Sequence, residues 1–242
     1  MPGVPTIEVT ELEKWTHNYI VSNLVVRENR LYLGDAVCSI SVLRWDETSQ
    51  ELVNVARDYT PLWPISLETL SLNSVITCNN DCNLLVYNVN TADKRLEEAG
   101  NYYLGDSVNK FIPGALTGSS EEAVRPEQMF ITSMGRIGVI SEFDERLSLP
   151  LTALQRNLEN VVHSIGGIKH SRWRAPKNIR GISDSMKEAT GFLDGDFLEH
   201  FLELDSNSKE ATKVMQGNSA VEKVDLSYLE VVRALEQLQS VH

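Results

Sequence analysis

Residues 188–204 read EATGFLDGDFLEHFLEL and gather four ionisable side chains in a short space: Asp194, Asp196, Glu199 and His200. Carboxylates and imidazoles serve as general acids and bases, and they also bind metal ions. The letters DGD resemble the start of a calcium-binding loop. The ladder of oxygen ligands that should follow is replaced by Phe197 and Leu198, so a calcium site is not predicted.

The same stretch also fits the start of a helix. Asp196 can cap a helix that starts at Phe197, and Asp194 adds negative charge near its N-terminus. Gly195 permits a tight turn between the two aspartates. One broad apolar stripe follows, made of Phe197, Leu198, Phe201 and Leu202. We therefore predict a helix docked in an interior, with Glu199, His200 and Glu203 facing away from the stripe.

Motifs of known catalytic or cofactor chemistry are absent from the rest of the sequence. There is no nucleophile elbow, no glycine-rich phosphate loop and no His-Glu-x-x-His pair. Cys78 and Cys82 form CNNDC, but no second pair at zinc spacing completes a site. We predict a protein that is not an enzyme and has no metal or cofactor. A small hydrolase with an unrecognised site is the weakest alternative.

Composition limits the classes of partner. The chain has 242 residues, a formal net charge of -12 and three cysteines. An acidic surface argues against general nucleic-acid binding, and few cysteines fit reduced thiols. No apolar run approaches the roughly 20 residues of a membrane span. The N-terminus does not resemble a signal peptide. We expect an intracellular, soluble protein that has no membrane partner.

One segment departs from this acidic character. The stretch from Lys169 to Lys187 carries six basic residues and one acidic residue, Asp184. Its candidate nucleic-acid contacts are Lys169, Arg172, Arg174, Lys177 and Arg180. A solvated loop, or an internal contact with the acidic part of the chain, is the commoner arrangement for such a segment.

Residues 20–143 show the pattern of β-strands. Short runs rich in β-branched and aromatic residues alternate with turn residues, and no long helical period interrupts them. A strand–turn–strand pattern occurs three times, as LYLGDAVCSISVL, VITCNNDCNLLVY and MFITSMGRIGVIS. Units of roughly 40 to 50 residues are typical of β-propeller blades. We predict a partial propeller of about three four-stranded blades.

Alternation within one strand supports stacked blades. Leu85, Tyr87 and Val89 should face one side, whereas Leu84 and Val86 should face the other. Both faces are apolar, as expected for a sheet that lies between two others. Closed propellers have roughly four to eight blades, so three would leave open edges.

Helical periodicity replaces the strand pattern from Ser148 onward. Ser148 is the predicted cap of a first helix, with Pro150 in its first turn and Gly166-Gly167 as its end. Asp225 is the predicted cap of a last helix. The predicted apolar face of that helix comprises Leu226, Leu229, Val232, Leu235 and Leu238.

The stretch ARDYTPLWPI, residues 56–65, falls between two predicted blades. Arg57, Tyr59 and Trp63 lie close together, and Pro61 and Pro64 stiffen the connection. Aromatic and arginine side chains on a rigid loop are typical protein-binding anchors. Trp63 could instead belong to the blade core, and the sequence does not decide between the two.

Four motifs together resemble a known family. ARDYTPLW, YYLGDSVNKF, HSIGGIKHSRWR and ATGFLDGDFLEHFLEL are similar to the C-terminal part of the DNA damage-binding protein 1 family. Large splicing-factor and polyadenylation-factor subunits share the architecture of this family. The resemblance runs from about Tyr19 to His242. It implies three seven-bladed propellers and a helical domain in the full-length proteins, and a fragment here.

The resemblance implies a scaffold. The family includes the adaptor of a cullin–RING ubiquitin ligase, whose first and third propellers form a cleft for helical motifs of substrate receptors and whose middle propeller holds the cullin. The cleft residues carried over by motif are Arg57, Tyr59, Pro61, Trp63, Val108, Asn109 and Phe111. The implied partners are such receptors and the missing propeller portions, with nucleic acid contacted indirectly.

The resemblance also sets the expected organisation and location. Residues 1–17 form an N-terminal extension, 18–143 the propeller blades and 144–242 the helical domain. The expected location is the nucleus, and also the cytoplasm. The implied roles are the DNA-damage response and ubiquitin-dependent protein turnover. The alternative is a nucleic-acid-associated subunit of the splicing or mRNA cleavage and polyadenylation machinery.

Overall fold

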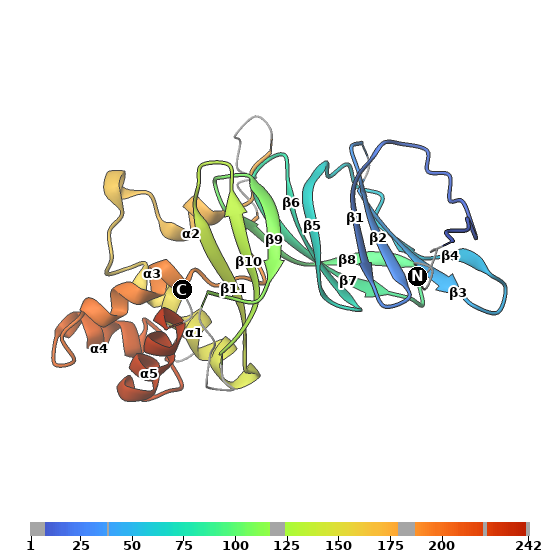
Figure 1. Cartoon of the computed structure of the whole chain (residues 1–242). Helices are drawn as coiled ribbons and strands as arrows, with labels where there is room; N and C mark the ends of the chain where they lie inside the picture. Colours follow the sequence, from blue (N-terminus) through green and yellow to red (C-terminus); the bar gives the residue numbers. More distant parts are fainter. Residues whose placement is uncertain (1–7, 38, 117–123, 179–186, 220–221, 241–242) are drawn as a thin grey trace, which may run out of the picture.

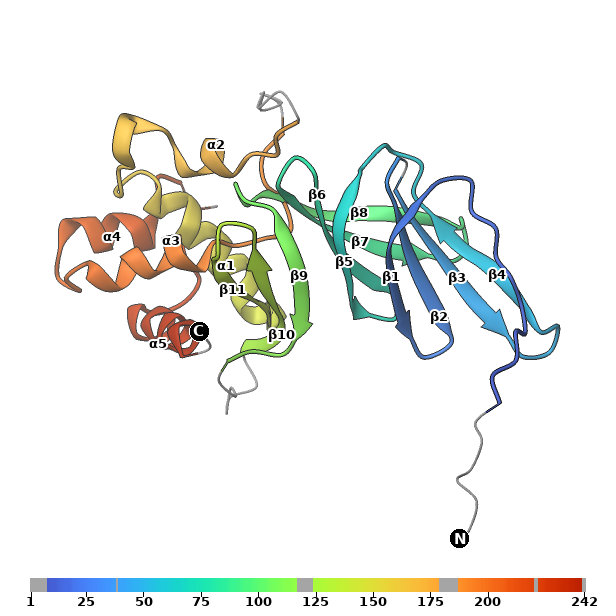
Figure 2. The same cartoon turned by 45° about the horizontal axis from the view of Figure 1, so that its top comes forward.

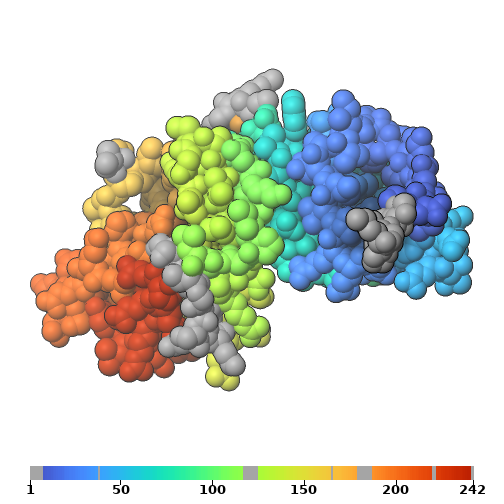
Figure 3. All heavy atoms as spheres, viewed as in Figure 1, coloured from blue at the N-terminus to red at the C-terminus, as the bar shows by residue number. Residues whose placement is uncertain are grey.

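The computed structural model describes residues 8–37, 39–116, 124–178, 187–219 and 222–240. It is mainly β, with helices in the C-terminal part, as predicted. Figures 1 and 2 show the blades in one row, and the colours of Figure 3 follow the same order. The helical region lies beside the last blade, at the far end from the first.

The first blade is an antiparallel meander of four strands in chain order. Each strand pairs with the next along the sequence. The strands are β1 (Val21–Arg27), β2 (Arg30–Asp35), β3 (Ile40–Asp46) and β4 (Glu51–Arg57). The segment before β1, from residue 8 to residue 17, has no regular secondary structure.

The second blade repeats this meander. Its strands are β5 (Pro64–Ser71), β6 (Ser74–Asn79), β7 (Asn83–Asn90) and β8 (Arg95–Tyr103). One parallel bridge, Arg57 with Arg95, joins the outer strands of the two blades. Strand β5 was not predicted, because Pro61 and Pro64 suggested a connection at this place.

The third blade has three strands within the described residues, which corrects the prediction of three four-stranded blades. They are β9 (Val108–Pro113), β10 (Val124–Thr132) and β11 (Ile137–Phe143). The chain then turns into a helix at Glu145 instead of adding a fourth strand. The three repeated motifs of the sequence correspond to the central hairpins β2–β3, β6–β7 and β10–β11.

The second blade is apolar on both faces, which confirms the predicted alternation along β7. Leu85 and Tyr87 lie in a cluster shared with the first blade, and Val89 packs against it. Leu84 lies in a cluster shared with the third blade, and Val86 packs against that one. Removing both faces from water stabilises the stack, because each buried aliphatic or aromatic side chain contributes about 1.5–3 kcal/mol.

The helical region has a separate core. Its elements are α1 (Glu145–Leu158), α2 (His170–Arg174), α3 (Gly195–Glu199), α4 (Lys209–Gln216) and α5 (Tyr228–Gln239), with single 3-10 turns at η1 (Ile165–Gly167) and η2 (His200–Glu203). The core is made of Leu151, Leu154, Leu158, Leu198, Phe201, Val214, Val224, Val231 and Leu235. None of the described helices is long and apolar enough to cross a membrane.

The predicted bounds of the first helix were wrong at both ends. It begins after Asp144, not after Ser148, because Phe143 and Leu147 already pack against the helical core. Pro150 therefore lies inside the helix, where its missing N–H removes one backbone bond. The helix ends at Leu158, well before Gly166-Gly167.

The predicted start of the last helix was wrong by two residues. Ser227 caps α5 and forms a capping box with Glu230, whereas Asp225 does not cap it. Leu229 is 67% exposed, so its predicted place on the apolar face was wrong. The rest of the predicted face is confirmed: Leu235 is buried, and Leu226, Val232 and Leu238 pack against the helical core. Val231 and Ala234 are buried as well. A reciprocal cap satisfies two N-terminal donors, which a lone aspartate two residues upstream cannot do.

Candidate docking face and interdomain junction

The loop between β4 and β5 is held rigid by a buried aspartate. The carboxylate of Asp58 accepts a hydrogen bond from the hydroxyl of Ser39 and another from the backbone N–H of Thr60, at 3.3 Å. The backbone N–H of Asp58 donates to the carbonyl of Ile40 at 3.0 Å. These bonds fix residues 58–60 against the neighbouring β2–β3 turn.

The structure decides between the two interpretations of Trp63. Leu62 is the residue that enters the core between the blades. The side chain of Trp63 is 51% exposed, and that of Tyr59 is 70% exposed. The Arg57 guanidinium lies 5.6 Å from the centre of the Tyr59 ring, and Pro61 is also exposed. The loop thus displays two aromatic side chains on a buried anchor.

The backbone of Trp63 is in the left-handed region, with a φ of 48°. A bulky residue rarely adopts this conformation, and such strain gathers at functional sites. The Trp63 carbonyl accepts a hydrogen bond from the N–H of Asn80 at 3.1 Å, which holds the strained residue in place. The conformation directs the indole outward while Leu62 stays buried.

Successive loops at this end of the blades are joined by backbone hydrogen bonds. The Leu104 N–H donates to the Cys82 carbonyl at 3.0 Å, and the Ser133 N–H donates to the Ser107 carbonyl at 2.9 Å. Together with the bond from Asn80 to Trp63, they link the loops of the second and third blades. We call residues 36–39, 58–63, 80–82, 104–107 and 133–136 the docking face; residue 38 is outside the described part.

Asp106 organises the third blade's side of the docking face. Burial alone would raise the pKa of Asp106. Hydrogen bonds from the Thr132 hydroxyl and from the backbone N–H groups of Ser107 and Met134 outweigh this effect and lower that pKa. The carboxylate is therefore ionised at neutral pH and acts as a structural acceptor. Met134 exposes 80% of its side chain beside it.

The second group of predicted cleft residues is placed differently. Val108 and Phe111 have 0% and 2% of their surface exposed and belong to the core between the second and third blades. Asn109 is exposed. The described structure therefore presents Arg57, Tyr59, Pro61, Trp63 and Asn109 to solvent, whereas Val108 and Phe111 support the fold from inside.

Asp194 is the centre of the stretch that first suggested acid chemistry. Its carboxylate is 2.7 Å from Nε2 of His170 and 2.7 Å from Nε of Arg174. It also accepts the backbone N–H of Phe197 at 3.4 Å, so Asp194 is the cap of α3 and the predicted Asp196 is not. The backbone N–H of Asp194 donates to the side chain of Gln155 in α1 at 2.8 Å.

The electrostatics of Asp194 are those of a buried structural anion. Burial would raise the pKa of this carboxyl, but the hydrogen bond from His170, the charge of Arg174 and the hydroxyl of Tyr102 hold it far below its usual range. The His170 ring also stacks on Phe197, with centroids 3.9 Å apart. Asp194 thus joins α1, α2, α3 and β8, and its ionised oxygens are already engaged.

Two residues of the basic segment are used inside the molecule. Besides Asp194, Arg174 lies 4.9 Å from the centre of the Tyr102 ring and donates to the carbonyls of Tyr103 and Leu104 at 3.4 and 3.3 Å. Lys177 has its ammonium group against the rings of Tyr103 and Trp173. Arg174 and Lys177 are therefore engaged in contacts within the molecule, which is the commoner arrangement for a basic segment of this kind.

The other basic residues differ from these two. Lys169 and Arg172 are exposed on either side of His170, and Trp173 beside them is 47% exposed. Arg180 lies outside the described residues. A nucleic-acid contact of this segment stays a prediction, and Lys169 and Arg172 are its available members.

The apolar stripe of the opening stretch docks as predicted. Leu198 and Phe201 are fully buried in the helical core, and Phe197 and Leu202 pack against that core. His200 forms a surface pair with Glu203 at 3.4 Å. Glu199 accepts a hydrogen bond from Gln239 of α5 at 3.0 Å. The stretch is an internal junction of the fold.

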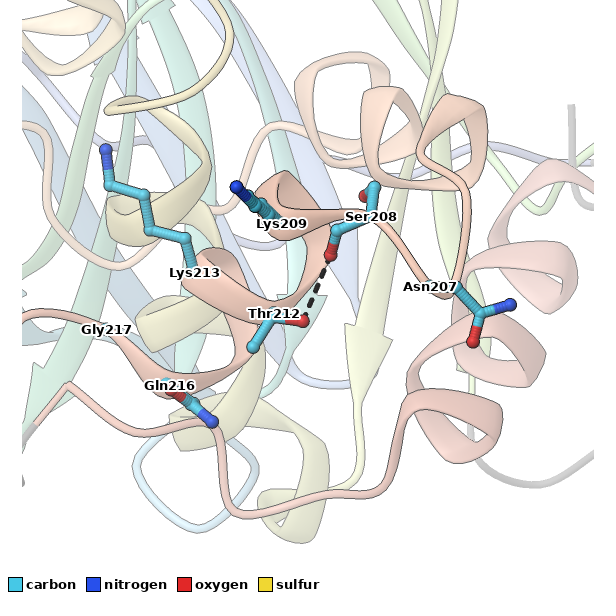
Figure 4. Close-up of a pocket in the computed structure, with 7 residues that line it drawn as sticks. All are labelled: Asn207, Ser208, Lys209, Thr212, Lys213, Gln216 and Gly217. Atoms are coloured by element: carbon cyan, nitrogen blue, oxygen red, sulfur yellow. Dashed lines mark hydrogen bonds between the residues drawn. The ribbon is translucent and has the colours of Figure 1, made fainter.

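One hollow of about 340 Å³ lies on α4 and is lined by Asn207, Ser208, Lys209, Thr212, Lys213, Gln216 and Gly217. Figure 4 shows these residues, with the Thr212 hydroxyl donating to the Ser208 carbonyl at 3.0 Å. Across the described ranges, no three His, Cys, Asp or Glu residues are grouped to hold a metal ion.

Comparison with known proteins shows the family of this chain. Residues 8–203 match the model of the CPSF A subunit region. The chain belongs to the CPSF A subunit region family. It is 33% identical over 204 residues to DNA damage-binding protein 1a of Arabidopsis thaliana, covering 80% of this chain and 18% of that protein. It is 32% identical over 237 residues to DNA damage-binding protein 1 of Solanum lycopersicum, covering 93% and 21%.

A third relative agrees with these two. DNA damage-binding protein 1 of Oryza sativa subsp. japonica is 32% identical over 193 residues, covering 76% of this chain and 17% of that protein. The chain therefore spans about a fifth of the length of the relatives that it matches. The resemblance inferred from the four sequence motifs is confirmed, and the match to the CPSF A family covers the blades and the start of the helical region.

Proposed function

We propose that this chain is a non-enzymatic protein-interaction scaffold that binds helical motifs of substrate receptors on its docking face. The observation that carries the proposal is the β4–β5 loop, in which Tyr59 and Trp63 point outward while Asp58 and Leu62 are buried. Exposed aromatic residues on a rigid support are the usual hot spots of protein interfaces. Little conformational entropy is lost on binding, because the loop is already fixed.

A helical partner suits the chemistry of this face. An amphipathic helix presents apolar side chains at steps of three and four residues, and it needs a few apolar contacts in a row. Tyr59 and Trp63 on the β4–β5 loop and Met134 on the β10–β11 loop provide exposed apolar contacts on this face. As the resemblance of the sequence motifs implies, we further propose that the chain belongs to the adaptor of a cullin–RING ubiquitin ligase, active in the DNA-damage response and in ubiquitin-dependent protein turnover.

Exposed apolar residues on the first blade favour a second kind of partner, namely further propeller blades of the full-length protein. Ile20, just before β1, and Leu24 and Val26 within β1 expose 77%, 58% and 63% of their surface. Three blades are fewer than the roughly four to eight of closed propellers. We propose that further blades cover these side chains, and that the assembled protein acts in the nucleus and also in the cytoplasm.

An alternative function is a nucleic-acid-associated role in splicing or in mRNA cleavage and polyadenylation. The observation that favours it is the exposure of Lys169 and Arg172 beside Trp173 on α2. Basic residues contact phosphates and an indole can stack on a base. The net charge of -12 opposes it. A binding constant that falls steeply with salt, and falls less steeply in Arg172→Ala, would support this alternative.

Binding of a helical receptor peptide tests the main proposal. Trp63→Ala should weaken binding of a synthetic receptor docking helix by roughly 30-fold or more, as expected for a hot-spot residue. Trp45→Ala is the matched control, because Trp45 lies at the opposite end of β3 from the docking face. Both variants should keep the fold of the wild type. Equal affinities for wild type and Trp63→Ala would reject the docking face.

A further inference from the structure

Lys177 occupies a corner formed by two aromatic rings. Its Nζ lies 3.6 Å from the centre of the Tyr103 ring and 4.4 Å from that of Trp173. The two rings are edge to face, with centroids 5.9 Å apart and planes at 81°. This is the arrangement in which π faces attract an ammonium ion. Among the described residues, no carboxylate forms an ion pair with Lys177.

The corner closes a clasp between the two parts of the chain. We define the clasp as residues 170–178, which leave the helical region and lie against β7 and β8 of the second blade. The backbone N–H of Lys177 donates to the Asn83 side chain at 3.0 Å, and the Asn83 amide donates to the Lys177 carbonyl at 2.6 Å. Arg174 fastens the same clasp to the carbonyls of Tyr103 and Leu104.

The amine of Lys177 is partly exposed and chemically unusual. Partial burial lowers the pKa of Lys177, and the nearby charge of Arg174 lowers it further. A lowered pKa leaves more neutral amine at physiological pH, and the neutral amine is the nucleophile. Lys169 is exposed and lies over no aromatic ring among the described residues, so it serves as an internal reference.

We propose that Lys177 is an acylation site, and that its acylation releases the clasp from the second blade. The donor is an acyl thioester or a comparable activated acyl compound. The amine nitrogen attacks the acyl carbonyl, a C–N amide bond forms, the C–S bond breaks, the thiol leaves and the ammonium proton passes to solvent. The product carries no charge, so the attraction to both rings is lost.

The release follows from how Lys177 is held. Its charge is stabilised by π faces and not by an acid, so neutralisation leaves no buried anion behind. Since Arg174 contacts the carbonyls of Tyr103 and Leu104, loosening the clasp would also free the 104–107 loop of the docking face. This inference does not depend on which partner binds that face.

Labelling of the folded full chain tests whether the amine reacts. Limiting acetic anhydride at pH 7.5, followed by peptide mass spectrometry, should modify Lys177 at a rate equal to or above that of Lys169. A rate more than tenfold below that of Lys169 would overturn the proposal. This experiment requires no variant, so a folding defect cannot obscure it.

Site-specific incorporation of acetyl-lysine tests the consequence. Acetyl-lysine at position 177 should speed amide hydrogen exchange in residues 170–178 at least tenfold, whereas acetyl-lysine at position 169 should leave it unchanged. Lys177→Arg should retain the protection, because a guanidinium also lies favourably on aromatic rings. Unchanged exchange after acetylation at 177, or equal release after acetylation at 169, would reject the proposed role.

Discussion

Gly191 lies so close to the backbone of Gly100 that position 191 has no room for a larger residue. A Cβ atom on Gly191 would be 2.7 Å from the Gly100 Cα and 2.5 Å from the carbonyl oxygen of Ala99. Just beside this contact, Asn101 and Thr190 exchange backbone hydrogen bonds at 2.8 and 2.9 Å. The second blade and the chain leading to α3 are therefore joined backbone to backbone.

Gly191→Ala should destabilise the protein by about 1–3 kcal/mol from backbone strain alone, since φ is +70° at this position. The collision with Ala99 adds to that cost. Gly195→Ala is the matched control four residues away, because a Cβ there meets nothing within 4 Å. Urea unfolding monitored by circular dichroism measures both. Equal stability of the two variants would contradict the close approach.

Asp194→Ala should cost more than the loss of a helix cap. The substitution leaves Arg174 mostly buried without its carboxylate partner, and breaking a buried ion pair costs about 3–5 kcal/mol. Asp196→Ala should change stability by a few tenths of a kcal/mol, because exposed charges near a helix N-terminus contribute about 0.3–1 kcal/mol. Thermal unfolding of both variants checks the difference. Similar losses of stability in the two variants would contradict the assignment of Asp194 as the cap of α3.

The stability of the wild type should fall as the solution is acidified below about pH 4. The unfolded carboxyl of Asp194 has the usual pKa of roughly 3.9, and the folded one lies below it. The unfolded state therefore binds more protons in this window, so the contribution of Asp194 is present above it and lost as the pH falls. Asp194→Asn should show a flatter decline between about pH 4 and pH 2.

Comparing the pH dependence of stability in wild type and in Asp194→Asn isolates the contribution of the Asp194 carboxyl. Asp106 also has a lowered pKa, but it is present in both proteins and contributes equally to both curves. Urea unfolding at half-unit pH steps provides the free energies. Parallel curves for wild type and Asp194→Asn would show that Asp194 is not a low-pKa group.

Gly138→Ala should destabilise the third blade. Gly138 pairs with Phe130 across β10 and β11, and a Cβ at this position would collide with the Phe130 ring, which covers the glycine. Overpacking of this kind costs about 1–3 kcal/mol. Glu142→Ala is a control on the exposed side of the same strand. Hydrogen exchange of the β10–β11 amides should rise in Gly138→Ala and stay unchanged in Glu142→Ala.

Much of the fold could be predicted because it is locally encoded. The three central hairpins carry their own turn residues and alternation, so they were found from the sequence. The stripe Phe197, Leu198, Phe201 and Leu202 has helical spacing and does dock in the helical core. Strand β5 was missed because its first residue, Pro64, suggested a connection, whereas its N-terminal end tolerates proline.

The candidate site was only partly predictable. The binding role of Tyr59 and Trp63 stays a prediction. Their exposure could not be read from the sequence, because it depends on whether Leu62 or Trp63 fills the gap between the blades. Val108 and Phe111 looked like surface residues by motif and are interior by packing. The role of Lys177 left no local signal, because Tyr103 is 74 positions away in the chain.

By itself, the sequence determined the repeating strands, the helical stripes and the family, since all three depend on residue types at fixed short spacings. Only the tertiary structure decided between Asp194 and Asp196. Both aspartates can cap a helix, and they differ by two positions. Asp194 became the cap and the ionic centre because the fold brings Arg174 and His170 to one of its oxygens and Tyr102 to the same carboxylate. Long-range partners of this kind have no local pattern.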